Sequence, residues 1–261
     1  MSKLTEENKH ELLELYKQQK MDSRQLANKF NITLQSVIRY LKRNGIERKR
    51  FNYGKKYNNT ELKHDFFSDI NNEKSAYYAG FIAADGSIYR HPSKPMQGRL
   101  TIEIHQKDRE ILENFDVGTE IFSRKTRKMV SKAISSDRIC GDLEKCGIVQ
   151  NKTFKLKFPE NIDEENIPHF IRGYFDGDGW FTVCKRGYIR SGFVGCKEFL
   201  EKLQTFLPCK SSLRIPKGKK YAIITINHNN TIRFSEFMYK KATIFLKRKR
   251  NIVANFSESL H

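Results

Sequence analysis

One motif of eleven residues occurs twice in the chain, and this repeat constrains the fold more than any other feature. Residues 78–88 are YAGFIAADGSI, and residues 171–181 are IRGYFDGDGWF. Both copies have glycine at the third position, an aromatic residue at the fourth, a small residue at the seventh, aspartate at the eighth and glycine at the ninth. Because a repeated sequence implies a repeated unit of structure, we predict two similar halves.

The second copy taken alone is open to two other interpretations. An EF-hand that starts at Asp176 would need a ligand at the fifth position, glycine at the sixth and glutamate at the twelfth. The chain has Trp180, Phe181 and Gly187 there, which argues against a calcium loop. An Asp-Gly pair is also typical of a plain turn. The presence of two copies favours the end of a helix instead.

Small residues lie four positions apart in each copy, at Gly80 and Ala84 and again at Gly173 and Gly177. On a helix, residues four apart share one face. Small side chains on that face let two backbones approach closely. We therefore predict that the two motif helices pack against each other.

Asp85 and Asp178 would then lie together at the C-terminal ends of the two helices, with Gly86 and Gly179 ending them. A helix C-terminus carries a partial negative charge, so two carboxylates there are unfavourable. A divalent cation between the carboxylates would remove the conflict. Hard oxygen ligands suit Mg²⁺, and the pattern predicts a magnesium site.

Composition narrows the class of partner. The chain of 261 residues has 49 Lys and Arg against 30 Asp and Glu, a formal net charge of +19. Such a charge favours a polyanion, with nucleic acid first and an anionic membrane surface second. No apolar run is long enough for a membrane span, and no secretory signal is visible, so a cytoplasmic location is expected. The five cysteines form no CxxC pair, which favours reduced thiols over a zinc site.

The amino-terminal segment is basic, and its pattern predicts three helices. The first begins near Thr5, the second at Asp22 or Ser23, and the third after Thr33. A tight turn at Asn31, a residue type that tolerates the left-handed conformation, separates the second from the third. This order resembles a helix-turn-helix, and an ordinary three-helix bundle is the alternative.

In a helix-turn-helix the third helix would bind DNA through its first turns and its basic tail. The candidate DNA-binding residues there are Gln35, Ser36, Arg39, Lys42, Arg43, Arg48, Lys49 and Arg50. The next segment is rich in Lys and Asn and lacks a clear period, so it is either a tether along DNA or a solvated linker. The four predicted segments are a helix-turn-helix domain at 1–47, a basic linker at 48–72, a first repeat at 73–157 and a second repeat at 158–261.

Each repeat is predicted to contain a helix, two strands, a helix, two strands and a helix, and the last helix is expected at 231–240. The two motifs followed by this order resemble the LAGLIDADG homing endonuclease family in its single-chain form. The resemblance implies an α+β fold of two pseudo-symmetric αββαββα repeats that form a saddle over the DNA major groove. It also implies a monomeric, site-specific double-strand DNA endonuclease that uses two or three Mg²⁺ ions, cuts a long asymmetric target and leaves short 3′ overhangs. No small-molecule substrate is expected.

The resemblance also implies roles for particular residues. Asp85 and Asp178 would bind the metal ions and carry catalysis, with Ala84 and Gly177 beside them. A polar residue after the second strand would order water, and this is Gln106 in the first repeat but Cys196 in the second. Lys152 and Lys249 would lie near the metal site, although either lysine could equally be solvated or contact phosphate. The candidates for contacts in the DNA groove are Arg99, Glu103, Tyr188, Arg190, Arg214 and Tyr221.

Two other functions share this fold. A WhiA-type DNA-binding regulator places its helix-turn-helix after the repeats and lacks the acidic pair, whereas this chain has the helices first and keeps both aspartates. An RNA maturase would use the same basic saddle in intron splicing, and the sequence does not discriminate against it.

Overall fold

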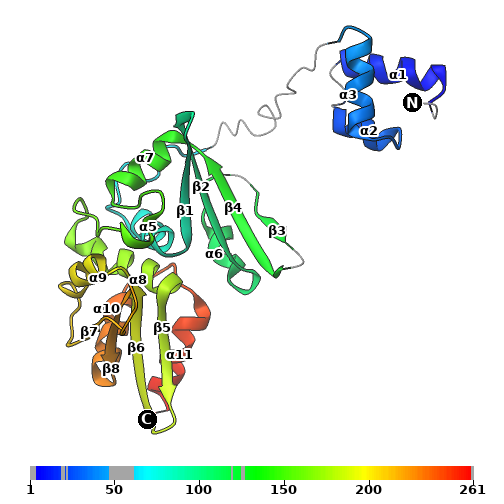
Figure 1. Ribbon diagram of the computed structural model, residues 1–261. Coiled ribbons are helices and arrows are strands. Elements are labelled where there is room, and N and C mark those ends of the chain that lie inside the picture. The colour runs from blue at the N-terminus through cyan, green and yellow to red at the C-terminus, as the bar shows by residue number, and fades with distance from the viewer. Residues whose placement is uncertain are drawn as a thin grey trace. The chain divides into compact units, whose positions relative to one another are not determined.

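The structure is a computed structural model, shown in Figure 1. The residues that it describes are 4–18, 21, 23–46, 62–118, 120–124 and 127–259. The chain divides into two compact units, one within residues 1–58 and the other within residues 59–261. Of the predicted DNA-binding residues, Arg48, Lys49 and Arg50 lie outside the described residues, as does much of the expected linker.

The first unit contains the three predicted helices: α1 (Glu6–Lys17), α2 (Ser23–Lys29) and α3 (Leu34–Arg43). The hydroxyl of Thr33 accepts a hydrogen bond from the backbone N–H of Ser36 and so caps α3. Asn31 has a φ of 49°, which confirms the left-handed turn between α2 and α3. The buried side chains of this unit are Leu4, Leu12, Tyr16, Leu26, Ala27, Val37 and Leu41.

The second unit begins its first repeat with the motif helix α5 (Glu73–Asp85). The elements that follow are β1 (Gly86–His91), β2 (Lys94–His105), the short 3-10 helix η1 (Gln106–Asp108), α6 (Arg109–Asn114), β3 (Phe122–Arg124), β4 (Met129–Ser135), α7 (Asp137–Lys145) and η3 (Lys152–Phe154). The strands form an antiparallel sheet in the order β1-β2-β4-β3.

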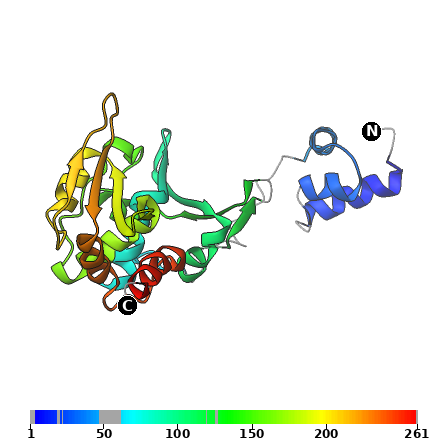
Figure 2. The same ribbon diagram turned by 90° about the horizontal axis from the view of Figure 1, so that it is seen from below.

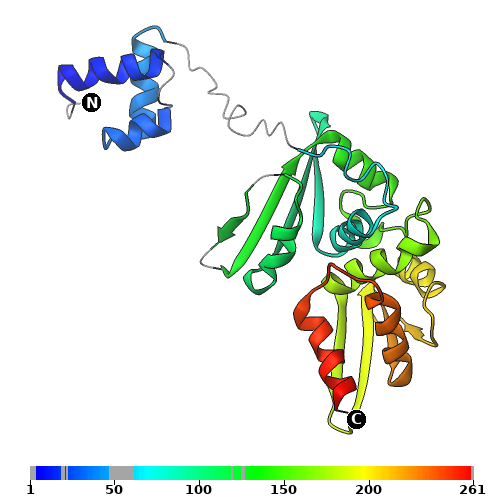
Figure 3. The ribbon, with the colours of Figure 1, turned by 180° about the vertical axis from the view of Figure 1, so that it is seen from behind.

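The second repeat has the same order. Its elements are η4 (Glu164–Asn166), α8 (Ile167–Asp178), β5 (Gly179–Cys184), β6 (Tyr188–Gly195), α9 (Lys197–Gln204), β7 (Ser212–Arg214), β8 (Ala222–Asn227), α10 (Asn229–Tyr239) and α11 (Lys247–Glu258). Its sheet order, β5-β6-β8-β7, reproduces that of the first repeat, so the α+β fold of two αββαββα repeats is confirmed. Figures 2 and 3 show α10 and α11 together on one side of the second sheet.

Helix α11 extends the second repeat beyond the last helix that the sequence predicted. Its sequence, KRKRNIVANFSE, is polar and has few apolar residues at helical spacing. Val253 and Phe256 are buried, and they hold the helix against the repeat. Every helix among the described residues is too short or too polar to cross a membrane.

The motif helices α5 and α8 pack with their backbones in contact, as predicted. A Cβ added at Gly80 would lie 2.0 Å from the carbonyl oxygen of Phe170, and one added at Gly173 would lie 1.9 Å from that of Tyr77. The two contacts are equivalent, each made by the motif glycine of one repeat with the backbone of the other. Small residues are therefore required here because the opposing chain occupies the space of a side chain.

Gly86 and Gly179 end the two helices, but not in the left-handed conformation usual for a terminal glycine. Their φ values are −84° and −95°, which any residue adopts. Space is the reason for glycine here, since an added Cβ at Gly86 would lie 2.6 Å from the side chain of Ile82. The chain thus passes directly from each helix into the first strand of its sheet.

The helix contact can be tested by adding one methyl group to it. We expect Gly80→Ala to lower the free energy of unfolding by about 1–3 kcal/mol or more, because the methyl group has no room and overpacking shifts the backbone. Urea denaturation measures the change. Gly141→Ala in α7 is the matched control: its Cβ would meet nothing closer than 3.9 Å, and alanine favours a helix by about 0.5–1 kcal/mol. Equal stability of Gly80→Ala and the parent would contradict the packing.

Candidate active site

The two motif aspartates lie side by side at the ends of α5 and α8. Asp85 is the last residue of α5, and Asp178 is the last residue of α8. A carboxyl oxygen of Asp85 lies 3.1 Å from the position that a Cβ would take on Gly177, so this carboxyl group reaches over the second motif. The predicted meeting of the two helix ends is therefore present in the structure.

Both carboxyl groups have a raised pKa. For Asp85 the pKa is about 6, first because protein atoms displace water around the carboxyl group and then because Asp178 is a nearby negative charge. Partial burial also raises the pKa of Asp178. Two carboxylates that repel each other are the environment in which bound positive charge is most favourable.

Lys152 binds the end of the first motif helix. Its ammonium group donates to the carbonyl oxygens of Ala84 at 3.0 Å and Gly86 at 2.6 Å, one residue before and one residue after Asp85. Burial lowers the pKa of Lys152. The lysine thus places its charge where the carbonyl groups of the helix end concentrate negative charge.

Lys249 does the same at the end of the second motif helix. Its ammonium group donates to the carbonyl oxygens of Phe175 and Gly179, both at 2.6 Å, and more weakly to Gly177 at 3.5 Å. Burial lowers the pKa of Lys249 to about 8. The predicted metal neighbours Ala84 and Gly177 therefore direct their carbonyl groups toward lysines.

The lysines and aspartates are paired across the repeats. Asp178, Lys152 and Ala84 line one cavity of about 300 Å³, together with Tyr174. On the other side, the carboxyl group of Asp85 lies beside Gly177, near which Lys249 is bound. Burial and the charge of Asp178 raise the pKa of Asp85 most, and both lysines lower it, Lys249 more than Lys152. Burial also raises the pKa of Asp178, and there Lys152 lowers the pKa more than Lys249.

Gln106 and Cys196 are not equivalent, contrary to the sequence prediction. Strand pairing matches Gly86 with Ile102 and Gly179 with Phe193, so the position of Cys196 corresponds to His105. Lys197 then takes the place of Gln106, and each of these two residues begins a helical turn. Sequence alone misplaced the pair by one residue because the two strand ends share no identical residue.

Gln106 is exposed, and no hydrogen bond among the described residues joins its side chain to an aspartate. Cys196 is buried and its thiol contacts the carbonyl oxygen of Leu156 at 3.3 Å. The structure therefore brings together Asp85, Asp178, Lys152 and Lys249, and leaves Gln106 at the edge of this cluster.

The predicted groove residues lie on the sheet faces that the helices leave open. In β2, Leu100, Ile102 and Ile104 are buried and alternate with the exposed or half-buried Arg99 and Glu103. Tyr188 and Arg190 occupy the corresponding face of β6, and pairing through β8 places Arg214 on it as well. Tyr221 precedes β8 and lines the cavity beside Asp178.

The sequence prediction missed three exposed aromatic side chains near these residues. Tyr89 pairs with Arg99 and is 50% exposed, and Phe122 is 46% exposed on the edge strand β3. Phe154 is 59% exposed and lines the cavity with Lys152. Strict alternation along β1 could have identified Tyr89, whereas the turn that carries Phe154 has no sequence period.

In the first unit, the described candidates lie along α3. Gln35, Arg39, Lys42 and Arg43 are exposed, opposite the buried side chains of Val37 and Leu41. The hydroxyl of Ser36 lies 2.8 Å from that of Thr33, at the start of the helix. The exposed face of α3 is thus basic and polar.

The cluster fits a divalent cation only in part. Asp85 and Asp178 offer hard oxygen donors whose mutual repulsion a cation would relieve. No group of three or more His, Cys, Asp or Glu side chains that could hold a metal occurs among the described residues. Further ligands would have to come from water or from a bound phosphate.

Comparison with known proteins identifies the fold. The chain matches no family model and no curated protein sequence. The LAGLIDADG meganuclease I-AabMI bound to uncleaved DNA matches at 13% identity over 70% of this chain and 89% of that chain, with a TM-score of 0.50. A mutant of I-SmaMI matches at 14% identity over 72% and 90%, also with a TM-score of 0.50. The I-LtrWI LAGLIDADG homing endonuclease bound to target DNA matches at 12% identity over 76% and 90%, with a TM-score of 0.47.

The chain has the LAGLIDADG fold. The two neighbours with a TM-score of 0.50 support this statement, and it agrees with the paired motif helices and the two four-stranded sheets.

The coupling between the two carboxyl groups can be measured directly. We expect Asp178→Asn to lower the pKa of Asp85 from about 6, because the neighbouring negative charge is lost, while burial keeps it above its usual value. Carboxyl ¹³C shifts of labelled aspartate, followed against pH in metal-free buffer, give the pKa. Asp163→Asn, on the surface ahead of η4, should leave it unchanged. An unaltered titration of Asp85 in Asp178→Asn would contradict the coupling.

Proposed function

We propose that the protein is a single-chain LAGLIDADG endonuclease that cuts both strands of a duplex DNA target with the help of the divalent cation Mg²⁺. The observation that carries the proposal is the joint position of Asp85 and Asp178 at the ends of two touching helices, with each helix end bound by a lysine of its own repeat. The two neighbours used for the fold are a meganuclease bound to DNA and a mutant of I-SmaMI.

The reaction is phosphodiester hydrolysis at two positions, one in each strand. A water oxygen forms a bond to phosphorus, and one phosphorus–oxygen bond of the backbone breaks. Magnesium held by the two carboxylates would stabilise the attacking and leaving oxygens. Asp85 and Asp178 hold the positive charge at this place, and Lys152 and Lys249 add a fixed cation on each side that attracts a phosphate.

The open faces of the two sheets form the DNA-binding surface in this proposal. Its candidate residues are Arg99, Glu103, Tyr188, Arg190, Arg214 and Tyr221, with Tyr89 and Phe122 added from the structure. A net charge of +19 supplies the attraction to phosphates, and the alternate side chains of the strands supply contacts to base edges. The two faces differ in sequence, which suits an asymmetric target.

The amino-terminal helices act as a second DNA-binding element, a helix-turn-helix. The exposed face of α3 carries Gln35, Arg39, Lys42 and Arg43, and its first turn is the part that such a helix directs at bases. This element would extend the site on DNA beyond the contacts of the two repeats. One chain contains both repeats, so the enzyme acts as a monomer.

The metal role of the aspartates is tested by replacing their charge alone. We expect Asp85→Asn and Asp178→Asn each to slow cleavage by about a hundredfold or more, because the carboxylate that holds the cation is lost. Binding measured in Ca²⁺ should hold or tighten, since a negative charge near the DNA is removed. Gel assays of a mapped target in Mg²⁺ measure cleavage. Glu198→Gln in α9 is the charge-matched control and should cut at the parental rate. Parental cutting by Asp178→Asn would refute the assignment.

The role of the first unit is tested by removing it. Deleting residues 1–58 should weaken binding and shorten the nuclease footprint, but should leave the cut positions unchanged, because both aspartates remain in the second unit. Two single substitutions test DNA contact while the unit stays folded. Arg39→Ala on α3 should weaken DNA binding, whereas Lys17→Ala on α1 should not. A footprint of unchanged length after the deletion would assign these helices another role.

A further inference from the structure

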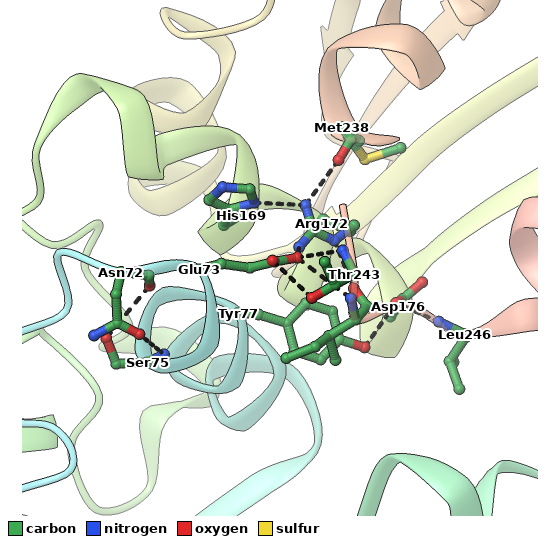
Figure 4. Close-up of polar contacts among 11 residues, drawn as sticks. Asn72, Glu73, Ser75, Tyr77, His169, Arg172, Asp176, Met238, Thr243 and Leu246 are labelled. Atoms are coloured by element: carbon green, nitrogen blue, oxygen red, sulfur yellow. Dashed lines mark hydrogen bonds and ion pairs between the residues drawn. The ribbon is translucent and has the colours of Figure 1, made fainter. Parts of the chain in front are cut away.

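An ion pair between Arg172 and Glu73, the first residue of α5, joins the two motif helices (Figure 4). Arg172 of α8 is fully buried, and its guanidinium group donates to a carboxyl oxygen of Glu73, in α5, at 2.6 Å. Its other N–H groups donate to the carbonyl oxygens of Met238 and Ile244, both at 2.8 Å. The guanidinium group also lies over the ring of Tyr77. A charge this deeply buried is stable only when its partners are fixed.

The same ion pair holds the segment that leads into α11. The carboxylate of Glu73 accepts hydrogen bonds from the N–H of Thr243 at 2.7 Å, from its hydroxyl at 2.8 Å and from the N–H of Ile244 at 3.3 Å. We call residues 243–250 the strap. Its first two residues are thus bound by a carboxylate of the first repeat and, through Arg172, by the second.

Asp176 holds the middle of the strap. It is only 1% exposed, and one carboxyl oxygen accepts hydrogen bonds from the hydroxyl of Tyr77 and from the N–H of Leu246, both at 2.8 Å. Leu246 is the residue that caps α11. The sixth position of the second motif therefore contacts the strap.

The end of the strap is bound to the first repeat. Arg248 donates two hydrogen bonds to the carboxylate of Asp108, at 2.7 and 2.9 Å, and Asp108 lies in η1 directly after β2. Lys247 forms an ion pair with Glu110 at 2.6 Å. The contacts of Leu246, Lys247 and Arg248 directly precede Lys249, so they fix the backbone on its amino-terminal side.

Lys152 is held differently. It lies in η3 after Asn151, which has a φ of 56°, and its carbonyl oxygen accepts hydrogen bonds from the N–H groups of Lys155 and Leu156. These are backbone contacts within its own turn. The position in α5 that corresponds to Asp176 is Ala83, which has no carboxylate to offer.

We propose that Asp176, Glu73 and Asp108 are positioning residues for Lys249, and that they act on the cleavage of one DNA strand only. The inference rests on the proposed endonuclease function. The carboxyl group of Asp85 lies beside Gly177, whose carbonyl oxygen Lys249 contacts at 3.5 Å, whereas Lys152 lines the same cavity as Asp178. A loosened strap therefore misplaces the ammonium group of Lys249 and leaves that of Lys152 in place. Misplacement by about 1 Å can cost on the order of a hundredfold in rate.

The test follows each strand of a mapped duplex separately. Both 5′ ends carry different labels, the full chain is in excess over DNA, and Mg²⁺ starts a single turnover. Lys249→Met identifies the strand that depends on Lys249, and Lys152→Met identifies the other. Asp176→Ala gives α8 the side chain that α5 has at the same position. We expect it to slow the Lys249-dependent strand at least tenfold and the other strand less than twofold, so that nicked DNA accumulates.

A second variant keeps the test decisive if Asp176→Ala does not fold. Arg248→Met removes the bridge to Asp108 at the surface end of the strap, and the same strand should slow. Glu144→Gln, which weakens the ion pair of Arg90 in the first repeat, is the control for general destabilisation and should leave the ratio of the two rates unchanged.

The outcomes separate the inference from the proposed function. Equal slowing of both strands by Asp176→Ala and Arg248→Met, or slowing of the Lys152-dependent strand, overturns the positioning role while the enzyme remains an endonuclease. Equal effects of Lys249→Met on both strands also overturn it. A parent protein that binds the target and cuts neither strand overturns the proposed function itself.

Discussion

The contact between the backbones of α5 and α8 is the constraint on which the second unit depends. Gly80 and Gly173 lie where a side chain would collide with a carbonyl group of the opposing helix. This close approach brings the ends of the helices together, and with them Asp85 and Asp178. It also fixes the distance between the two sheets, because each helix continues directly into the first strand of its own sheet. A larger separation of the helices would move the two aspartates apart and shift the two sheets relative to each other.

The close approach of the two helix ends brings negative charges together, and the two lysines offset part of the resulting repulsion. Two helix C-termini and two carboxylates meet within a small volume, all of them negative or partly negative. Lys152 and Lys249 are bound to carbonyl oxygens, so they neutralise the helix ends more than the carboxylates. The raised pKa of Asp85 is consistent with repulsion that remains between the two carboxylates. In the proposed enzyme, divalent cations would offset that remainder and would also attract the phosphates of a bound DNA.

The sequence predicts the parts of this structure that follow from local patterns. Small residues four apart predicted the helix contact, and alternation predicted the open sheet faces. It could not predict α11, because its charged residues are used in long-range ion pairs that leave no apolar period. The role of Asp176 was hidden for a similar reason. Its partners, Tyr77 and Leu246, are distant in sequence, and nothing in the motif itself distinguishes a buried acid from a metal ligand. The correspondence between Gln106 and Lys197 could be found only from the register of the paired strands.

The two repeats share a backbone plan but differ in how they support their chemistry. A homodimer would have the same residue at both copies of every position, whereas a single chain can have Ala83 in one motif and Asp176 in the other. Here the second copy has a buried carboxylate where the first has alanine, and the strap that leads into α11 is bound to it. Such divergence gives the two motif lysines different supports within one pseudo-symmetric scaffold. Because the strap is held by carboxylates from both repeats, its position depends on how the two repeats pack against each other.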